Sequence, residues 1–229
     1  MKNLTWKNPE QLFVAQVLIN KVKSKCCGIK VILKLQNSIS MIQSKKELKE
    51  YLLLEGKNYQ SQIGGLGRRF WMNLFSNPIC EQKYIWLYIK TLRLVEYYEN
   101  LKNRHKIFLL VYVYYLHKLR KYSHITGYQI PPHIISKGLT IWHWGPIIIN
   151  PSASIGENCT IYPGVLIGHK NPGEGCAVIG NNVFIGAGTK IIGRVKIGNN
   201  VIIGQNCVIT KDIPDNTTVV CGENRMIKK

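Results

Sequence analysis

The stretch IGNNVFIGAGTKIIGRVKIGNNVIIGQNCVI, residues 179–209, has an isoleucine at every sixth position. The same spacing extends back to Ile149, and the twelve positions between Ile167 and Ile179 keep the phase. A small or β-branched residue stands two positions before each isoleucine, and a glycine directly follows most of them. A period of six fits neither an α-helix nor a single alternating strand, so it indicates a repeat architecture.

Such a repeat predicts a β-helix built from short, flat strands. The isoleucines and the small residues before them would point into the interior, while glycine or asparagine would allow tight turns. Three hexapeptides, about 18 residues, would close one coil, and each coil would bury the face of its neighbour. Cys159 and Cys207 occupy small-residue positions, so we predict core packing for them rather than a redox or metal role.

Residues 1–125 have a different, helical pattern. No glycine or proline occurs between Pro78 and Thr126, apolar residues recur at helical spacing, and a break is expected near residues 100–103. Ser44 and Glu47 form a capping-box pattern that predicts a helix start. We therefore expect an α+β chain with a helical region over 1–125 and a β-helical domain over 126–229. Met41 directly precedes the capped helix, and one hypothesis places the natural start there.

Positive charge is concentrated in the helical region. The chain has a net charge of +19, of which +15 falls in residues 1–125 and +4 in residues 126–229. A basic module attracts anions such as nucleic acid, anionic lipid or phosphorylated small molecules, although lysine-rich helices are also simply well solvated. The run KNRHKIFLLVYVYYLHKLRKY, residues 102–122, fits either a helix lying on a membrane surface or an ordinary packed helix.

The cysteines and apolar runs predict a cytoplasmic protein. Seven cysteines, an odd number without paired metal-ligand spacing, do not form a disulfide framework. The apolar runs at 12–20 and 107–116 are too short to cross a bilayer, which needs roughly 20 apolar residues. Contact with the inner membrane face through the basic half is a further expectation.

Several motifs carry a resemblance to a known family. They are a GYQIP segment at 127–131, a histidine before the repeats, a coil-breaking loop HKNPGEGCA at 169–177, IGAGTKIIG at 185–193 and VITKDIPDNT at 208–217. Over about residues 127–217 the chain resembles the hexapeptide-repeat acetyltransferases of the serine acetyltransferase-like branch, including capsular and exopolysaccharide O-acetyltransferases. The resemblance implies a left-handed parallel β-helix, a homotrimer, and acetyl-CoA bound between neighbouring β-helices without a metal. It also implies a small-molecule or glycan acceptor rather than nucleic acid.

The segment GLTIWHWGPIIIN, residues 138–150, contains the candidate base, His143. Acetyl transfer from a thioester to a hydroxyl needs a base for the hydroxyl proton, and histidine titrates near working pH. The resemblance gives His143 this role. The sequence shows no pairing of a nucleophile with a base, so we expect direct transfer within a ternary complex rather than a covalent intermediate. From the residues alone, His143 could equally be packed between Trp142 and Trp144. Gly145 would let backbone or ligand approach closely.

Three positions depart from the serine-binding pattern of the family. Trp142 replaces an aspartate that holds the serine amino group, Gln129 replaces an aspartate that orients the base, and Cys176 stands nearest to a substrate-binding histidine. An amino-acid acceptor needs charged partners, whereas a tryptophan beside the base suits a stacked sugar ring. We therefore favour a sugar hydroxyl in a capsular or exopolysaccharide precursor. The alternative is serine O-acetylation in cysteine biosynthesis.

The resemblance also assigns residues to the donor. Ala187 and Gln205 are 18 positions apart, so they should stack one coil above the other and bind the pantetheine arm through backbone groups. Lys211 would lie near the CoA phosphates, unless it is an ordinary solvated lysine. His169 should stack below Ala187 by the same count, where it could contact donor or acceptor, although its place in a loop favours an ordinary solvated histidine. Contacts from Arg225 are not expected.

Two rival functions have weaker support in the sequence. A γ-carbonic-anhydrase-like zinc site needs three converging histidines, and the β-helical half offers only His143 and His169, with His133 just ahead. The other rival is a non-catalytic, basic β-helical scaffold that docks on a membrane surface.

Overall fold

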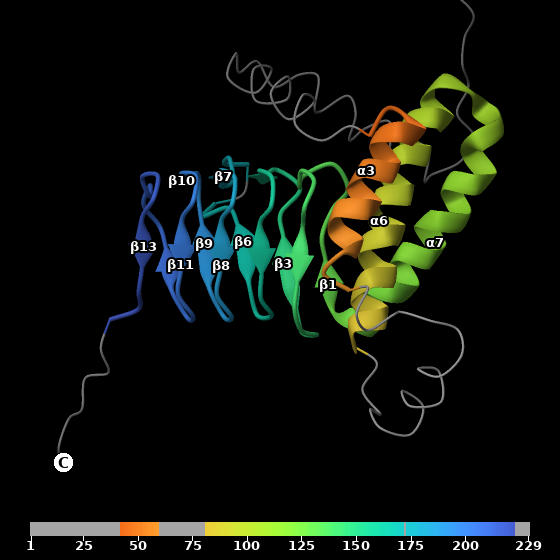
Figure 1. Cartoon of the computed structure of the whole chain (residues 1–229). Helices are drawn as coiled ribbons and strands as arrows, with labels where there is room; N and C mark the ends of the chain where they lie inside the picture. The colour runs from red at the N-terminus through yellow and green to blue at the C-terminus, as the bar shows by residue number, and fades with distance from the viewer. Residues whose placement is uncertain (1–41, 60–80, 172, 223–229) are drawn as a thin grey trace, which may run out of the picture. The chain divides into compact units, whose positions relative to one another are not determined.

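The computed structural model describes residues 42–59, 81–171 and 173–222. Figure 1 shows that helices come first along these residues and short parallel strands follow. The proposed start at Met41, the residues before it, the glycines at 64–67 and Arg225 lie outside the described residues. No described helix is long and apolar enough to cross a bilayer.

The helical region contains α3 (Lys45–Gly56), α6 (Glu81–Arg104), the short 3-10 helix η1 (Lys106–Phe108) and α7 (Leu109–Thr126). The Ser44 and Glu47 capping box is present, as predicted. The break between the long helices falls at residues 105–108, later than expected. The reason is that the Asn100 amide bonds to the Ile42 carbonyl, at 3.0 Å, and so leaves the helical backbone intact.

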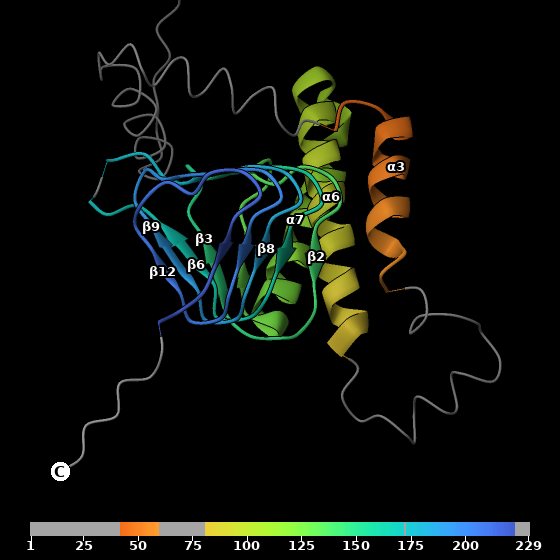
Figure 2. The same ribbon diagram turned by 60° about the vertical axis from the view of Figure 1, so that its left-hand side comes forward.

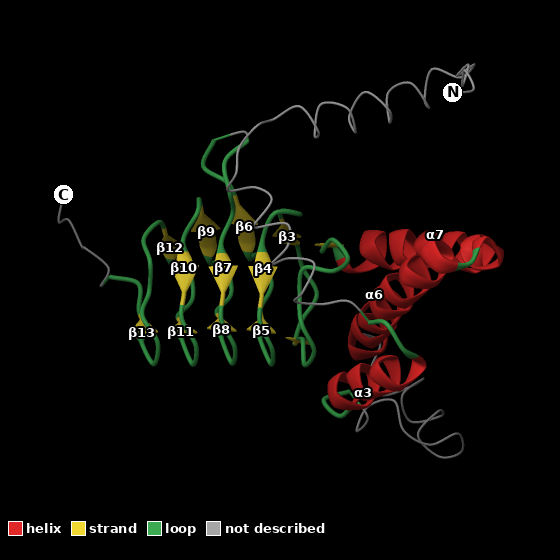
Figure 3. Cartoon of the chain, turned by 90° about the horizontal axis from the view of Figure 1, so that it is seen from above, coloured by secondary structure: helices red, strands yellow, loops and turns green. Residues whose placement is uncertain are grey.

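The rest of the chain forms three parallel sheets that wrap into a β-helix (Figures 2 and 3). Sheet 1 has the order β1-β3-β6-β9-β12, sheet 2 the order β10-β7-β4, and sheet 3 the order β13-β11-β8-β5-β2. The strands are β1 Tyr128–Gln129, β2 Thr140–Ile141, β3 Ile147–Ile149, β4 Ser154–Ile155, β5 Thr160–Ile161, β6 Leu166–Gly168, β7 Val178–Ile179, β8 Phe184–Ile185, β9 Lys190–Ile192, β10 Lys196–Ile197, β11 Ile202–Ile203, β12 Val208–Ile209 and β13 Thr218–Val219. This architecture confirms the predicted fold, which is a helical region followed by a left-handed parallel β-helix.

The interior of the β-helix is formed by the periodic isoleucines. They are buried from Ile149 through Ile209, together with the small residues that precede them. Cys159 and Cys207 belong to this core, as predicted. Cys176 is also buried, and burial raises the pKa of its thiol. A buried, protonated thiol is a poor nucleophile, so Cys176 is a packing residue.

One corner of the β-helix is built from stacked asparagines. Asn158, Asn182, Asn200 and Asn216 all have φ near 55°. Their side chains form a ladder in which each amide donates to the next carbonyl oxygen, at 3.2, 3.0 and 2.9 Å. Asparagine tolerates the left-handed backbone and also supplies the bridging hydrogen bonds, so the NN pairs of the repeat serve as turn residues.

We expect Asn182→Ala to destabilise the protein more than Asn182→Gly does. Both variants lose two ladder hydrogen bonds, each worth about 0.5–1.5 kcal/mol. Only alanine adds the cost of a left-handed backbone, about 1–2 kcal/mol. Urea denaturation followed by circular dichroism measures both. Equal stability of the two variants would show that the backbone conformation at this corner is not strained.

The helices cover the first coil of the β-helix. The Tyr59 hydroxyl donates to the Ile141 carbonyl and accepts from the Ile141 N–H, at 2.8 and 2.9 Å. The Tyr88 hydroxyl bonds the Ile130 carbonyl and N–H in the same way, both at 3.3 Å. Ile141 lies in the edge strand β2, whose backbone groups would otherwise lack partners on that side. These two tyrosines therefore replace a missing neighbouring strand.

A buried charge cluster joins helices and coil. Arg93 of α6 is fully buried and bonds Glu55 of α3 at 2.6 Å and Glu96 at 3.0 Å. Its guanidinium also donates to the carbonyls of Ile135 and Ser136, at 2.9 and 2.8 Å. Burial disfavours the charge on Arg93, but the two carboxylates raise its pKa overall. The cluster fixes α6, and with it the start of α6, against the first coil.

Candidate functional site

His143 lies in an extended turn between β2 and β3. Ile141 pairs with Ile161 and Ile148 pairs with Leu166, so six residues (142–147) pass where the next coil uses four (162–165). Gly145 holds this turn close to the next coil, because it has φ +138° and a Cβ there would lie 2.8 Å from Pro163. Gly145 therefore lets the backbone approach Pro163 closely, and the turn contains two more residues than the turn of the next coil.

The His143 side chain projects from this turn. It is 60% exposed, and its Nδ1 lies 2.9 Å from Oε1 of Glu81. The main-chain carbonyl of His143 accepts a hydrogen bond from the Tyr128 hydroxyl, at 2.8 Å. The imidazole is therefore anchored on one side and open to solvent, rather than packed between the two tryptophans.

The two tryptophans beside His143 have different environments. Trp144 is partly buried, donates through Nε1 to the Glu81 carbonyl at 3.2 Å and meets the Tyr84 ring edge-on. The Trp142 side chain is exposed. Its main-chain carbonyl accepts a hydrogen bond from the side-chain amide of Gln82 in α6, at 2.8 Å. Trp144 anchors the turn, whereas the Trp142 ring is available to a ligand.

An aromatic row extends from His143 along the β-helix. The ring centroids of His143 and Tyr162 are 6.2 Å apart, and those of Tyr162 and Phe184 are 5.3 Å apart. Tyr162 and Phe184 belong to the two coils that follow the His143 turn. The row therefore gives the imidazole an extended aromatic neighbourhood.

The donor residues Ala187 and Gln205 share this corner, where sheet 3 passes to sheet 1. The His143 turn links β2 to β3, the Ala187 turn links β8 to β9, and the Gln205 turn links β11 to β12. The Asn206 N–H donates to the Ala187 carbonyl at 2.8 Å, and Phe184 pairs with Ile202. The predicted stacking of Ala187 and Gln205 one coil apart is confirmed.

The predicted stacking of His169 below Ala187 is wrong. Leu166 pairs with Lys190, 24 positions on, because the loop 169–177 adds six residues to that coil. The residue below Ala187 is Pro163, whose carbonyl accepts from the Gly188 N–H at 2.9 Å. Counting 18 back from Ala187 ignores the inserted loop.

His169 and Lys211 lie where sheet 1 passes to sheet 2. His169 follows β6, and Lys211 follows β12 and precedes the bridge from Ile213 to Ile197. Nδ1 of His169 lies 2.9 Å from the Asn150 side-chain amide. Within one chain the structure therefore gathers Trp142, His143, Gly145, Ala187 and Gln205 at one corner, and His169 and Lys211 at another.

Glu81 is the site residue that the sequence did not reveal. It is the first residue of α6, 62 positions before His143. An acidic residue in the first turn of a helix is common because it complements the helix dipole, so its type and position gave no signal. The family pattern places the orienting carboxylate at position 129, where this chain has glutamine.

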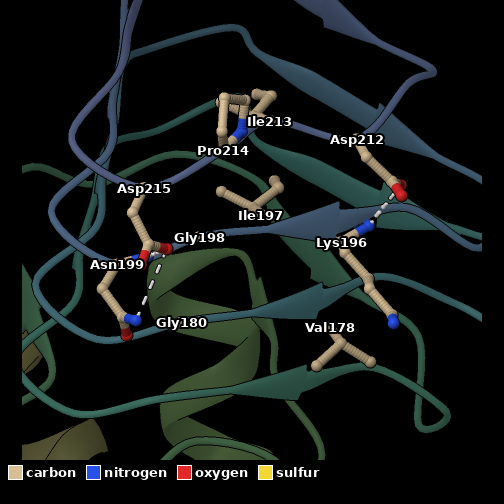
Figure 4. Close-up of a pocket in the computed structure, with 10 residues that line it drawn as sticks. All are labelled: Val178, Gly180, Lys196, Ile197, Gly198, Asn199, Asp212, Ile213, Pro214 and Asp215. Carbon is tan, nitrogen blue, oxygen red and sulfur yellow. Dashed lines mark hydrogen bonds between the residues drawn. The ribbon is translucent and has the colours of Figure 1, made fainter.

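In the described part of the chain, neither a metal site nor the pocket over β7 and β10 contributes residues to the corner that holds His143. Within residues 42–59, 81–171 and 173–222, no group of His, Cys, Asp or Glu side chains could hold a metal ion. The pocket in Figure 4 lies over β7 and β10. Its carboxylates, Asp212 and Asp215, accept the N–H groups of Lys196 and Asn199, at 2.8 and 2.7 Å, so both serve as turn caps.

Comparisons with known proteins agree with this architecture. The family "Bacterial transferase hexapeptide (six repeats)" matches residues 176–211. A serine acetyltransferase of Staphylococcus epidermidis is 43% identical over 74 residues, which cover 31% of this chain and 35% of the relative. One from Staphylococcus aureus is 42% identical over the same length. The matched part thus spans about a third of these curated relatives.

Solved structures show the same fold at lower identity. Serine acetyltransferase of Neisseria gonorrhoeae in complex with serine superimposes with a TM-score of 0.52 at 23% identity, covering 78% of this chain and 68% of that one. The Brucella abortus serine acetyltransferase gives 0.55 at 20% identity, covering 86% and 72%. The resemblance to hexapeptide-repeat proteins of the serine acetyltransferase-like branch is confirmed.

Proposed function

We propose that this chain is an acetyl-CoA-dependent O-acetyltransferase with His143 as its general base. The observation that carries the proposal is the exposed His143 imidazole, held through Nδ1, at the same corner as Ala187 and Gln205. The hexapeptide match and the serine acetyltransferase relatives support acetyl transfer as the reaction.

The reaction follows from this placement. Nε2 of His143 takes the proton of the acceptor hydroxyl while its oxygen attacks the thioester carbonyl carbon. The tetrahedral intermediate then collapses with cleavage of the carbon–sulfur bond, and His143 returns the proton to the departing CoA sulfur. No covalent acyl-enzyme is needed, because both substrates meet at one base.

The donor would bind along the stacked turns. Backbone groups at Ala187 and Gln205 would bond the pantetheine arm, and the small Ala187 side chain leaves space for it. Lys211 and His169 lie at the other corner, so they reach the same acetyl-CoA only if they come from a neighbouring subunit. We therefore propose a homotrimer in which grooves between β-helices join the two corners, with Lys211 near the CoA phosphates.

The acceptor is a hydroxyl compound of one of two classes. The exposed Trp142 ring and the row of Tyr162 and Phe184 favour a sugar, as in a capsular or exopolysaccharide precursor. The relatives are named serine acetyltransferases, and the Glu81 carboxylate would offer one partner to an ammonium group. The side chains thus favour a sugar, and the relatives favour serine.

The helical region also offers a surface for contact with a membrane. A cytoplasmic enzyme with the basic helical region against the inner membrane face is supported by exposed apolar side chains at the start of α7 and beside it, Ile107 and Leu110. The same exposure supports the rival, a non-catalytic scaffold, which would show no turnover of acetyl-CoA.

Release of free CoA thiol from acetyl-CoA tests the function and the acceptor together. The purified chain is assayed with serine, with UDP-N-acetylhexosamines and with no acceptor. We expect acceptor-dependent release that is faster with the sugar nucleotides, and mass spectrometry should find the acetyl group on a sugar oxygen. Faster release with serine would establish the alternative acceptor. Absence of release with every acceptor, together with no binding of acetyl-CoA by calorimetry, would refute the acetyltransferase.

A further inference from the structure

We infer that Glu81 is the positioning residue for His143: its carboxylate holds the imidazole in the tautomer that leaves Nε2 as the proton acceptor. This inference rests on the proposed function, since it assumes that His143 acts as a base. The base would then be assembled from two parts of the chain, the start of α6 and the extended turn between β2 and β3.

The contact between Glu81 and His143 belongs to a built interface. Three consecutive residues of the turn are bonded by two consecutive residues of the helix. The Gln82 amide donates to the Trp142 carbonyl, Glu81 Oε1 lies 2.9 Å from His143 Nδ1, and the Glu81 carbonyl accepts from Trp144 Nε1. The Glu81 side chain is only 23% exposed, so its carboxylate is confined beside the imidazole.

The protonation pattern follows from which groups can donate. An ionised carboxylate only accepts hydrogen bonds, so His143 must donate to Glu81 from Nδ1–H. In a neutral imidazole the other nitrogen, Nε2, then carries the lone pair. The carboxylate also stabilises the imidazolium that forms when Nε2 takes a proton. In the Ser-His-Asp triad of serine proteases, loss of the corresponding carboxylate selects the wrong tautomer and lowers kcat about 10⁴-fold.

The helix supplies what the β-helix lacks. The residue in the GYQIP segment is Gln129, and an uncharged amide cannot balance an imidazolium. Glu81 brings the missing negative charge from the helical region, which Arg93, Tyr59 and Tyr88 fix onto the first coil. The packing of the helices against the first coil is thereby linked to the tautomer of His143.

Glu81→Gln in the full chain separates positioning from packing. Glutamine keeps the size of the side chain but loses the charge. Its oxygen can keep the hydrogen bond from the Trp144 N–H, which Glu81 Oε2 accepts at 3.5 Å, and its NH2 group then faces Nδ1 as a donor and favours the opposite tautomer. We expect kcat to fall roughly 10- to 1,000-fold with little change in the KM for acetyl-CoA. At a pH high enough for the imidazole to be neutral, nitrogen-15 NMR of labelled histidine should show an unprotonated Nε2 on His143 in the wild type and a protonated Nε2 in Glu81→Gln.

Two further variants make the outcome decisive. Glu81→Asp keeps the carboxylate and should keep the wild-type tautomer with partial kcat. Glu50→Gln removes an exposed carboxylate that bonds Lys137 away from this corner, and it should leave kcat and tautomer unchanged. An unchanged His143 tautomer in Glu81→Gln would overturn the inference, whatever its rate. The tautomer is measured without substrate, so it is read independently of the assay. A wild type that neither releases CoA with any acceptor nor binds acetyl-CoA would refute the proposed function, and the tautomer result would still stand or fall by itself.

Discussion

Replacing Arg93 by methionine is expected to lower the free energy of unfolding by about 3–5 kcal/mol. Methionine fills much of the arginine volume, so the loss is chiefly electrostatic. It leaves the carboxylates of Glu55 and Glu96 buried together without their cation, and it removes the donor from the carbonyls of Ile135 and Ser136. Urea denaturation measures the change.

The loss should depend on pH through Glu55. Burial raises the pKa of Glu55, and Arg93 opposes that rise. A carboxyl with a raised folded pKa stabilises the fold below its unfolded pKa, and this contribution is lost as pH rises through the folded pKa. Without Arg93 the folded pKa rises further, so Arg93→Met should be less destabilising at pH 5 than at pH 8.

A neutral cluster provides the matched control for Arg93. Combining Arg93→Met with Glu55→Gln and Glu96→Gln removes all three buried charges while keeping oxygen acceptors for the N–H groups of Leu139 and His133. This variant should recover most of the lost stability. If Arg93→Met alone costs less than about 1 kcal/mol at both pH values, the cluster does not hold the helices to the coil.

The fold could be predicted because its signal is local. Each periodic isoleucine marks one short strand and the side of it that is buried. The period of six keeps its phase across the interruption before Ile179. The contacts that join the helices to the coil could not be predicted in this way. Arg93 and Glu55 look like ordinary helix-surface charges in sequence, and their burial depends on the packing of segments 38 positions apart.

The candidate site was only partly predictable for the same reason. The spacing of Ala187 and Gln205 gave the right stacking, because no insertion lies between β8 and β11. The same count failed for His169, because the loop 169–177 lies within that coil. No local sequence pattern marked Glu81 as a site residue, because its contact with His143 depends on how α6 packs against the first coil.

His143→Ala should lower acceptor-dependent kcat by about 10²–10⁴-fold, the usual contribution of a general base. The side chain is mostly exposed, so its loss should change the unfolding free energy little, and acetyl-CoA should still bind. His124→Ala is the matched control, because His124 is an exposed histidine in the last turn of α7. Its kcat should equal that of the wild type.

The most direct test of acetyl transfer at His143 is therefore kcat for CoA release by His143→Ala, measured beside wild type and His124→Ala with the best acceptor. We expect a loss of about 10²-fold or more in His143→Ala alone, with the fold and acetyl-CoA binding retained. A folded His143→Ala protein that releases CoA at the wild-type rate would contradict it, because the corner around His143 would then not be where acetyl transfer occurs.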